Sequence, residues 1–422
     1  MSLRETIRNL VPSGVRPRLR ALMEPPGIET RVLRPALFVP DPDQTPRLSF
    51  ILPSLSAKEA FGGVNTGLQY FLMLAAGVRA DTGAQIRILT EEPHDPADSA
   101  LDRVLSAADL QSGDVTIGSL AATGNQITTR ACEIFMVYNW WISLNIEPVL
   151  REQANHFGQA PLPKLYIIQE YEPHFYPFSS AHLLALQAFN SSWPMWSVFN
   201  SSELANYYAA QGNVCARSYV FEPKLTPAIK AFHDGLSAGE KTKTVLVYGR
   251  PSIKRNCFSI LLSGIKNWAS AAHPGGDWRI VSAGTAHKGT DLGNGYALTS
   301  LGKLSLENYG QLLRKTAIGV SLMSSPHPSY PPLEMAHFGI RTITNNYPGK
   351  DLSKRHDNIH PLADVMPATL GTALAREMAA FEADPGAGLR AASHIPSYLS
   401  DVPFDCLAEM TRDVVEVLED RV

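Results

Sequence analysis

The segment Gly249–Asn256 places three cations, Arg250, Lys254 and Arg255, between a predicted strand and a predicted helix. The start of a helix attracts anions, because its first N–H groups are unpaired and its dipole is positive there. Arg250 and Lys254 add fixed charge that suits a diphosphate and can offset negative charge on a departing nucleotide. We expect only one of Lys254 and Arg255 to face the anion, and we choose Lys254. A solvated basic turn is the alternative.

The segment Ser325–Gly339 combines several prolines with a single carboxylate. Pro331 and Pro332 suit the first turn of a helix, where a missing N–H costs nothing. We expect Glu334 inside that first turn, where its oxygens can accept hydrogen bonds from ribose or sugar hydroxyls. A capping carboxylate that only stabilises the helix is the alternative.

Two aromatic segments follow predicted strands. Gln169–Phe178 mixes carboxylates and a histidine with aromatic rings, a combination that suits sugar binding or packing of the loop on its own domain. Tyr138–Ile142 contains a Trp pair that could line a site, although core packing is better supported.

Glycines and histidines give weaker signals. Gly62 and Gly63 form a pair in a loop after a strand, but without the GxGxxG spacing they are weak evidence for phosphate binding. NAD binding is disfavoured, because no acid stands clearly at the end of a second strand to hold a dinucleotide ribose, with Glu91 the nearest candidate. His327 and His337 are predicted to be hydrogen-bonded loop or core residues rather than ligands.

These loops belong to two consecutive βα series. The first begins with a strand at Leu48–Pro53 and a helix from Thr66, and the second with a strand at Thr244–Tyr248 and a helix at Cys257–Ala271. Further strands are predicted at Ile86–Leu89, Ile134–Tyr138, Lys164–Ile168, Trp196–Phe199, Trp278–Ser282, Ile318–Leu322 and Arg341–Thr344. Two more helices are predicted, one from an N-cap at Ser305 through Lys315 and one near Pro332–Phe338. Ligands of doubly wound sheets bind outside the carboxyl ends of the strands, where the candidate loops lie.

Composition excludes several classes of protein. The chain has 422 residues, of which 45% are hydrophobic and 18% charged, which is typical of a globular protein with a large core. Lys and Arg number 37 against 40 Asp and Glu, so the basic excess of a nucleic-acid-binding protein is missing. No apolar run is long enough to predict a membrane-spanning helix. The four cysteines are dispersed without a CxxC pair, which disfavours a zinc site and favours reduced thiols in the cytoplasm.

Residues 1–34 hold seven arginines against three acids and have no apolar core of a signal peptide. One interpretation is a basic arm that contacts an anionic membrane surface from the cytoplasmic side. A solvated leader or a strap over the surface is the alternative, because Pro12, Gly14 and Pro17 would interrupt a long amphipathic helix. The proline-rich segment Pro35–Pro46 is predicted to be an extended linker.

The order of the motifs resembles the GT-B glycosyltransferases of family four, and within them the WsaF-type rhamnosyltransferases of cell-surface glycan assembly. The likeness covers roughly residues 45–350. The segments that carry it are Phe61–Asn65, Tyr138–Trp141, Gln169–Pro173, Phe199–Glu203, Tyr248–Asn256 and His327–Ala336. The block from His327 to Met335 is the most specific of these, whereas Gly62–Gly63 and Asn200–Glu203 are generic.

The resemblance implies two Rossmann-like domains that face each other across a cleft, with a nucleotide sugar bound mainly by the second. Arg250 and Lys254 match the diphosphate pair of the family, and Glu334 matches the second glutamate of its E-x7-E motif. The first glutamate falls on Pro326, a departure that puts the donor-sugar contacts in doubt and loosely fits a deoxy sugar.

The resemblance also implies roles for site residues. The donor site would comprise Gly62, Gly63, Arg250, Lys254, Ser329, Tyr330 and Glu334. The acceptor site would comprise Gln169, Glu170, Tyr171 and Tyr176. The residues closest to the chemistry would be Gly63, Glu170, Arg250 and Lys254. No metal ion and no resident cofactor are expected.

The expected function is therefore transfer of a sugar, with L-rhamnose from dTDP-L-rhamnose as the first choice, onto a saccharide or lipid-linked glycan. The transfer would be metal-independent and retain the anomeric configuration. Two alternatives stay open: a nucleotide-sugar-binding scaffold of a glycan-assembly complex, and a sugar epimerase of the same fold. The predicted organisation is a leader over 1–47, an acceptor-side domain over 48–222, a nucleotide-sugar domain over 223–395 and a helical tail over 396–422 that crosses back to the first domain.

Overall fold

The structure, a computed structural model, describes residues 32–56, 63–95, 101–274 and 276–421. Most of the basic leader and Gly62 lie outside these described residues. Two compact units make up the chain. Residues 1–167, 172–196 and 411–422 form the first unit, and residues 168–171 and 197–410 form the second.

In the described part of the chain, seven strands form the first sheet in the order β4-β3-β2-β6-β7-β8-β9. They are β2 (Arg47–Leu52), β3 (Gln85–Thr90), β4 (Val115–Ser119), β6 (Glu133–Val137), β7 (Lys164–Ile168), β8 (Met195–Phe199) and β9 (Arg217–Val220). β2 pairs in parallel with both β3 and β6. The chain therefore winds outward in both directions from β2, and the direction reverses between β2 and β6.

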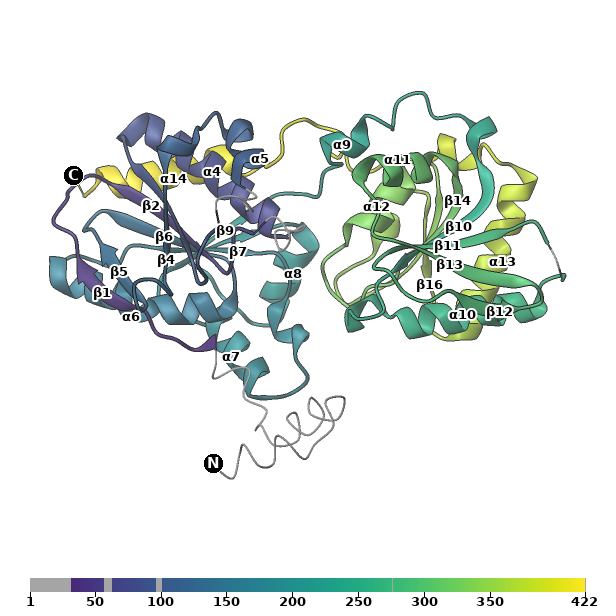
Figure 1. The fold of residues 1–422 in the computed structure, drawn as a ribbon, viewed down its shortest axis with the longest axis horizontal. Helices are drawn as coiled ribbons and strands as arrows, with labels where there is room; N and C mark the ends of the chain where they lie inside the picture. Colours follow the sequence, from purple (N-terminus) through teal and green to yellow (C-terminus); the bar gives the residue numbers. More distant parts are fainter. Residues whose placement is uncertain (1–31, 57–62, 96–100, 275, 422) are drawn as a thin grey trace, which may run out of the picture. The chain divides into compact units, whose positions relative to one another are not determined.

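The helices that accompany the first sheet are α4 (Gly63–Thr82), α5 (Leu101–Leu105), α6 (Trp140–Phe157), α7 (Ser180–Phe189) and α8 (Ser202–Ala210). The C-terminal helix α14 (Leu407–Glu419) packs beside α4, where a Cβ on Gly77 would lie 2.9 Å from Thr411 Cγ2 (Figure 1). The glycine thus lets the two helices approach closely. The last helix and strand of this series, α8 and β9, follow β8 directly in the chain. Their residues are part of the second unit, although β9 pairs in the first sheet.

The segment predicted to be a linker contains a strand. β1 (Leu37–Pro40) pairs in parallel with β5 (Gln126–Thr129) and forms a separate two-stranded sheet. Pro40 ends the strand, and proline is tolerated there because edge strands leave some N–H groups without a ladder partner. The predicted extended linker over Pro35–Pro46 is therefore extended at β1, but there it is a paired strand and not only a connection.

Seven strands of the described residues also form the second sheet, in the order β12-β13-β11-β10-β14-β15-β16. They are β10 (Thr242–Gly249), β11 (Arg279–Gly284), β12 (Thr290–Gly293), β13 (Tyr296–Gly302), β14 (Thr316–Val320), β15 (Arg341–Asn345) and β16 (Ile359–Leu362). The pairings are parallel except at the β12–β13 hairpin. Without β12, the order is that of a dinucleotide-binding sheet, with its switch point between β10 and β14.

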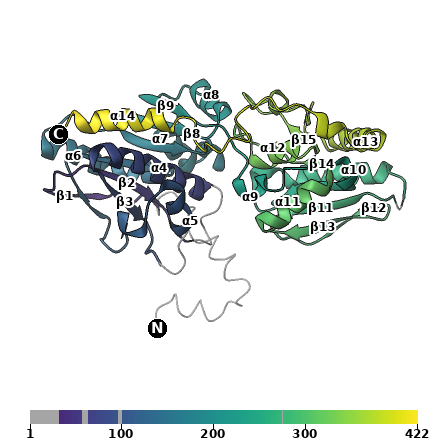
Figure 2. The same cartoon turned by 90° about the horizontal axis from the view of Figure 1, so that it is seen from above.

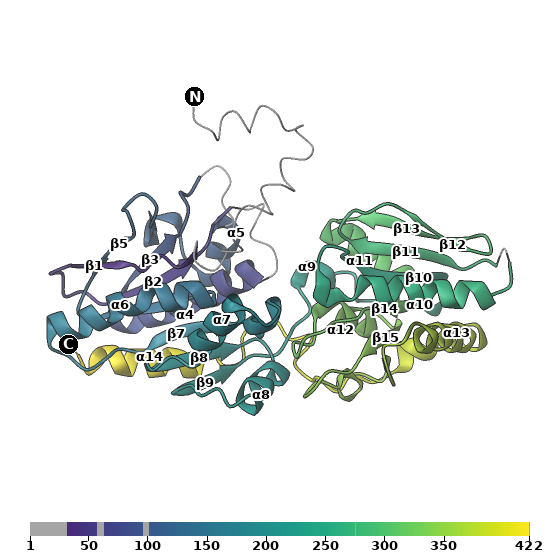
Figure 3. The same cartoon turned by 90° about the horizontal axis from the view of Figure 1, so that it is seen from below.

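Alternate side chains of β10 face opposite layers of helices. Val245 and Val247 pack with α10 (Phe258–Ala271) and α13 (Pro367–Ala383), which lie side by side in Figures 2 and 3. Leu246 packs on the other face with α11 (Leu306–Lys315) and α12 (Tyr330–His337). Each such aliphatic side chain contributes about 1.5–3 kcal/mol on burial. The prediction of two doubly wound α/β domains is confirmed.

Candidate functional site

The basic segment Gly249–Asn256 and the segment that contains Glu334 both lie at the switch point of the second sheet. The loop after β10 leads through a short 3-10 helix (Lys254–Asn256) into α10, and the loop after the neighbouring strand β14 leads into α12. The N–H of Ser324 donates to the carbonyl of Arg255 at 2.7 Å and joins the two loops. The structure therefore brings together the loops that carry Arg250, Lys254 and Glu334.

Two glycines make the first loop possible. A Cβ on Gly249 would lie 1.9 Å from the hydroxyl of Ser282, and Gly284 has a φ of 145° that disfavours other residues. Arg250 follows directly, with its Cγ 3.1 Å from the Cβ position of Gly284. Its guanidinium lies 3.5 Å from the hydroxyl of Tyr248 and is partly exposed, so it can meet an anion.

Lys254 and Arg255 point in different directions, as their adjacent positions predict. Lys254 is exposed, whereas Nε of Arg255 lies 3.6 Å from a carboxylate oxygen of Glu170. The exposed ammonium of Lys254 is thus the better placed of the two to bind an anionic ligand from solvent.

Glu334 lies one turn later than the sequence predicts. The helix begins at Tyr330, two residues before the expected start, so no acidic residue occupies its first turn and Glu334 lies in the second. The prediction of a first-turn carboxylate was wrong, because Ser329 rather than Pro331 ends the loop. Glu334 is therefore not a capping group, and the competing capping interpretation does not apply.

The Glu334 carboxylate is buried and has few partners. Tyr309 donates its hydroxyl to Oε2 at 2.9 Å, and no other described residue hydrogen-bonds to this side chain. Glu334 is 7% exposed, and burial raises its pKa to about 7. A buried carboxylate with unused acceptor capacity suits a ligand that brings hydroxyl donors.

The turn before α12 has a strained backbone. Ser329 adopts φ 68° and ψ 145°, a conformation that residues other than glycine rarely take, and its N–H donates to Nδ1 of His327 at 3.0 Å. This bond leaves the proton of the neutral imidazole on Nε2, which is buried without a partner. Burial, aided by the charges of Lys350 and Arg255, lowers the pKa of His327 to about 3. His327 is thus a neutral hydrogen-bond donor.

His327 and His337 differ in a way that the sequence did not predict. His337 is satisfied, because its ring nitrogens lie 2.7 Å from the carbonyl of Leu333 and 2.8 Å from the hydroxyl of Ser393. The prediction of a hydrogen-bonded core histidine is right for His337. For His327 it is right for Nδ1, which accepts from Ser329, but not for Nε2, which has no partner in the described structure.

Five polar side chains form a polar cluster behind this turn. Four of them are buried and Arg255 is partly exposed: Glu170, Arg255, Ser325, His327 and Lys350. Ser325 donates its hydroxyl to Glu170 and accepts the N–H of His327 at 3.0 Å. Lys350 donates to the carbonyls of Met323 and His327 at 3.1 and 3.4 Å. Burial raises the pKa of the Glu170 carboxyl, against the hydrogen bond from Ser325 and the charges of Arg255 and Lys350. The cluster fixes the β14–α12 loop.

Lys350 was missed in the sequence, although one signal could have found it. It ends the segment Asn345–Lys350, which follows β15 at the same edge of the sheet as the other loops. Burial lowers its pKa to about 8. Lys350 donates to carbonyl groups of a loop that is distant in the sequence. The position of those carbonyl groups is known only from the folded chain.

The other predicted site residues are less open. Tyr171 is buried, with its hydroxyl accepting from Asn213 at 3.1 Å, and the carbonyl of Gln169 accepts from Asn200 at 3.2 Å. Tyr176 belongs to the first unit, where its hydroxyl accepts from Trp140 at 2.9 Å. Gly63 begins α4 in that same unit.

Trp140 is a core residue, as the sequence predicts for the Trp pair, and packs with Ala185 and Ala188. Within the described residues, no group of three or more His, Cys, Asp or Glu side chains is placed to hold a metal ion. None of the helices in that part of the chain has the length and apolar character of a bilayer-spanning segment.

Comparisons with known proteins agree with this architecture. A family model described as "WsaF, N-terminal domain" matches residues 47–202, and one described as "WsaF, C-terminal domain" matches residues 243–375. The chain is 26% identical over 349 residues to the O-antigen biosynthesis protein RfbC of Myxococcus xanthus. That match covers 78% of this chain but only 26% of the relative's length.

Two solved structures share the fold. HepE of Anabaena, solved in complex with UDP, is 11% identical with a TM-score of 0.51, covering 89% of this chain and 100% of that one. The lipopolysaccharide outer core galactosyltransferase WaaB in its apo form is also 11% identical, with a TM-score of 0.50 and coverage of 88% and 99%. At such low identity the likeness shows the fold alone, which is the GT-B fold of two parallel-sheet α/β domains.

Proposed function

The chain belongs to the WsaF family, and from this premise we propose that it is a glycosyltransferase of surface-polysaccharide assembly, acting on a nucleotide-sugar donor and a saccharide acceptor. The observation that carries the proposal is the pair of loops at the β10–β14 switch point. They combine two cations with a buried carboxylate that has unused acceptor capacity. This combination fits a nucleoside diphosphate, whose phosphates need cations and whose ribose needs acceptors.

In this proposal Arg250 and Lys254 hold the diphosphate, and Glu334 accepts a hydrogen bond from a hydroxyl of the nucleoside sugar, which in dTDP is the 3′-hydroxyl of deoxyribose. The neutral Nε2–H of His327 and the main chain at Ser329 and Tyr330 face the donor sugar. Pro326 replaces a carboxylate at the motif position nearest to that sugar, which favours a donor with fewer hydroxyls to hold. We therefore propose dTDP-L-rhamnose as the donor.

The chemistry of the transfer follows from these roles. The acceptor hydroxyl oxygen forms a bond to the anomeric carbon while the bond from that carbon to the phosphate oxygen breaks. The electron pair goes to the leaving diphosphate, and the acceptor proton passes to the same phosphate oxygen. Arg250 and Lys254 offset the charge that builds there, the role that a metal ion plays in other transferases. We propose retention of the anomeric configuration by this front-face route.

A thermal-shift screen of the full chain against dTDP, UDP, GDP and NAD tests the proposal. We expect stabilisation by dTDP in the wild type and in Lys266→Ala, a matched variant with an exposed lysine on α10. The stabilisation should be lost in Arg250→Ala. Stabilisation by UDP or GDP alone would reject the rhamnose donor, and a chain that binds none of these nucleotides would contradict the proposal.

A nucleotide-sugar-binding scaffold is the second candidate, favoured by the proline at position 326. Such a protein would bind dTDP without transferring or slowly hydrolysing dTDP-rhamnose. A sugar epimerase would instead convert the donor in the absence of acceptor. Product analysis of donor incubated alone and with saccharides separates the three activities.

We further propose that the acceptor is lipid-linked and that the basic residues of the N-terminal leader contact the anionic membrane surface. The leader has seven arginines against three acids over residues 1–34. Sedimentation with vesicles containing phosphatidylglycerol, compared with vesicles of phosphatidylcholine alone, measures this contact. Equal sedimentation with both would contradict it.

A further inference from the structure

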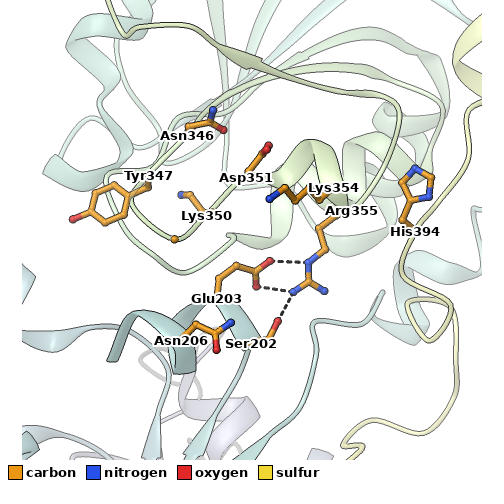
Figure 4. Close-up of a pocket in the computed structure, with 11 residues that line it drawn as sticks. Ser202, Glu203, Asn206, Asn346, Tyr347, Lys350, Asp351, Lys354, Arg355 and His394 are labelled. Atoms are coloured by element: carbon orange, nitrogen blue, oxygen red, sulfur yellow. Dashed lines mark hydrogen bonds and ion pairs between the residues drawn. The ribbon is translucent and has the colours of Figure 1, made fainter. Parts of the chain in front are cut away.

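A polar pocket of about 640 Å³ lies in the second unit beside the candidate donor loops (Figure 4). We call it the α8 pocket. Its walls are the first turns of α8 and the segment from Asn346 to Arg355, which follows β15 and includes a 3-10 helix at Leu352–Lys354. None of these residues belongs to the predicted donor or acceptor sites. The volume is within the usual range of ligand sites.

One wall of the α8 pocket is held rigidly. Arg355 donates to both carboxylate oxygens of Glu203, at 2.7 and 2.6 Å, and to the hydroxyl of Ser202 at 2.9 Å (Figure 4). A carboxylate oxygen of Glu222 lies 2.8 Å from the same guanidinium. Bidentate pairs of this kind fix geometry, so a ligand would meet a wall that needs no reorganisation.

The α8 pocket borders the β14–α12 loop through Lys350. This residue lines the pocket, and its ammonium donates to the carbonyls of Met323 and His327 in the β14–α12 loop. A ligand in the pocket would therefore lie next to the turn that contains Ser329. Such a neighbouring position is what a second substrate requires.

Most charged side chains of the α8 pocket already have partners within the protein. Arg355 is compensated by two glutamates, Lys350 is buried against carbonyls, and Asp351 accepts the N–H and hydroxyl of Ser353 at 3.1 and 2.6 Å. Lys354 is the exposed cation among the described lining residues. The walls thus favour a neutral polar ligand over a phosphate.

Two side-chain amides of the α8 pocket are available to hydrogen-bond with a ligand. Asn206 on α8 and Asn346 after β15 are exposed, lie on different walls, and have no side-chain partner in the described structure (Figure 4). Each amide offers donors and an acceptor, which matches a sugar hydroxyl that needs both. The ring of Tyr347 lines the same pocket and packs against Tyr207, with ring centroids 5.9 Å apart.

We propose that the α8 pocket binds the saccharide acceptor, with Asn206 and Asn346 hydrogen-bonding to its hydroxyls. This inference rests on the proposed glycosyltransferase function and names a site for its second substrate. It places the acceptor against α8 and the loop after β15 rather than against the buried side chains of Glu170 and Tyr171.

Saturation-transfer NMR of the full chain tests this proposal. The probes are the methyl glycosides of L-rhamnose, D-glucose, D-mannose and N-acetyl-D-glucosamine, with inorganic phosphate as a competitor. We expect at least one glycoside to bind the wild type and the matched variant Asn308→Ala, whose exposed amide lies on α11. Binding should weaken about three- to tenfold in Asn206→Ala and in Asn346→Ala, the loss expected for one neutral hydrogen bond.

A second variant, Asn206→Trp, fills the pocket from the exposed face of α8 and should abolish glycoside binding. Each variant is also assayed for stabilisation by dTDP, which reports folding and the donor site. Three results would overturn the acceptor pocket if dTDP binding is retained: no glycoside binds the wild type, phosphate displaces the bound glycoside, or the substitutions leave glycoside binding unchanged. The proposed function would stand in each case. Loss of dTDP binding in the wild type would overturn the proposed function instead.

Discussion

Glu133 in the first sheet and Glu334 beside the second are both buried carboxylates with very different partners. Glu133 accepts hydrogen bonds from Arg47, Arg87, Ser49 and the N–H of Arg130, and is fully buried. Glu334 is almost as buried but accepts one hydrogen bond, from Tyr309. Burial alone does not identify a site. A saturated carboxylate stabilises the fold, and one with spare acceptor capacity points to a ligand.

The surroundings of the two carboxylates show the same contrast. Glu133 begins β6, and Asp41 adds a second acid that lies 3.2 Å from Arg47 and 3.0 Å from Arg130. A third acid, Asp43, lies 2.7 Å from Arg130, so three acids and three arginines neutralise one another within the first unit. Near Glu334, the cations Arg250 and Lys254 have no acidic partner among the described residues, and Nε2 of His327 has no acceptor. The second sheet thus leaves its charges open to a ligand at the switch point.

Glu133→Gln should produce the largest loss of stability. Removing the charge leaves Arg87 buried without a counter-ion and Arg47 with Asp41 alone. Breaking a buried ion pair in this way typically costs about 3–5 kcal/mol in the free energy of unfolding. Urea unfolding followed by circular dichroism measures the loss. A variant as stable as the wild type would break the distinction between the two carboxylates.

Arg250→Ala should have the opposite profile, with little change in stability and a large loss of donor affinity. Its guanidinium is partly exposed and makes one weak contact, to Tyr248. Losing a charge-assisted bond to phosphate should weaken dTDP binding about ten- to a hundredfold. Titration calorimetry with Lys266→Ala as control checks this value. Equal affinities in the two variants would remove Arg250 from the site.

Glu334→Gln should change the pH dependence of stability. Because burial raises the pKa of Glu334 from 4.5 to about 7, the folded state binds more protons than the unfolded state between these values. Wild-type stability should therefore fall as the pH rises through this window, whereas the glutamine variant lacks the penalty. The melting temperature of the variant relative to the wild type should rise by a few degrees between about pH 5 and about pH 8.

Two controls sharpen this result. Tyr309 can still donate to the amide oxygen of the variant, so the packing is preserved. Saturating dTDP should narrow the difference in melting temperature, because the 3′-hydroxyl of its deoxyribose then donates to the charged carboxylate and favours it. A pH-independent difference in melting temperature would contradict the assignment of Glu334 as an under-satisfied buried carboxylate.

Ser329→Gly should have the smallest effect. The residue adopts φ 68° and ψ 145°, and glycine relieves that strain but adds flexibility to the unfolded chain. We expect a net gain of about 1 kcal/mol in the free energy of unfolding. Asp109→Gly, at a left-handed position of the first unit that aspartate tolerates well, serves as the matched control. A destabilised Ser329→Gly variant would indicate that its side chain holds the loop.

Much of the fold could be predicted because long buried strands have a clear apolar pattern. Every residue of β2 and β7 is buried, and both strands were found within one residue of their bounds. Five strands that the structure describes in the two large sheets were missed. Four of them lie at sheet edges, and the fifth, β13, pairs with the edge strand β12 and is also partly exposed: β4, β9, β12, β13 and β16. Their pairing depends on neighbours that a local pattern does not reveal.

For the candidate site, the strand order predicts which loops lie close together, but not the contacts between their side chains. The loops of Arg250 and Glu334 follow strands whose carboxyl ends must meet, so their convergence follows from the fold class. The contacts of Glu170 with Ser325 and of Lys350 with the β14–α12 loop join residues far apart in the chain. No spacing encodes such contacts, and the missing partner of His327 is likewise visible only in the folded protein.

A crystal structure of the full chain with dTDP tests the central claim most directly. We expect the diphosphate between Arg250 and Lys254, with the 3′-hydroxyl of the deoxyribose within hydrogen-bond distance of Glu334 and no nucleotide at the switch point of the first sheet. A nucleotide bound at the first sheet instead, or one seated in the α8 pocket, would contradict the account.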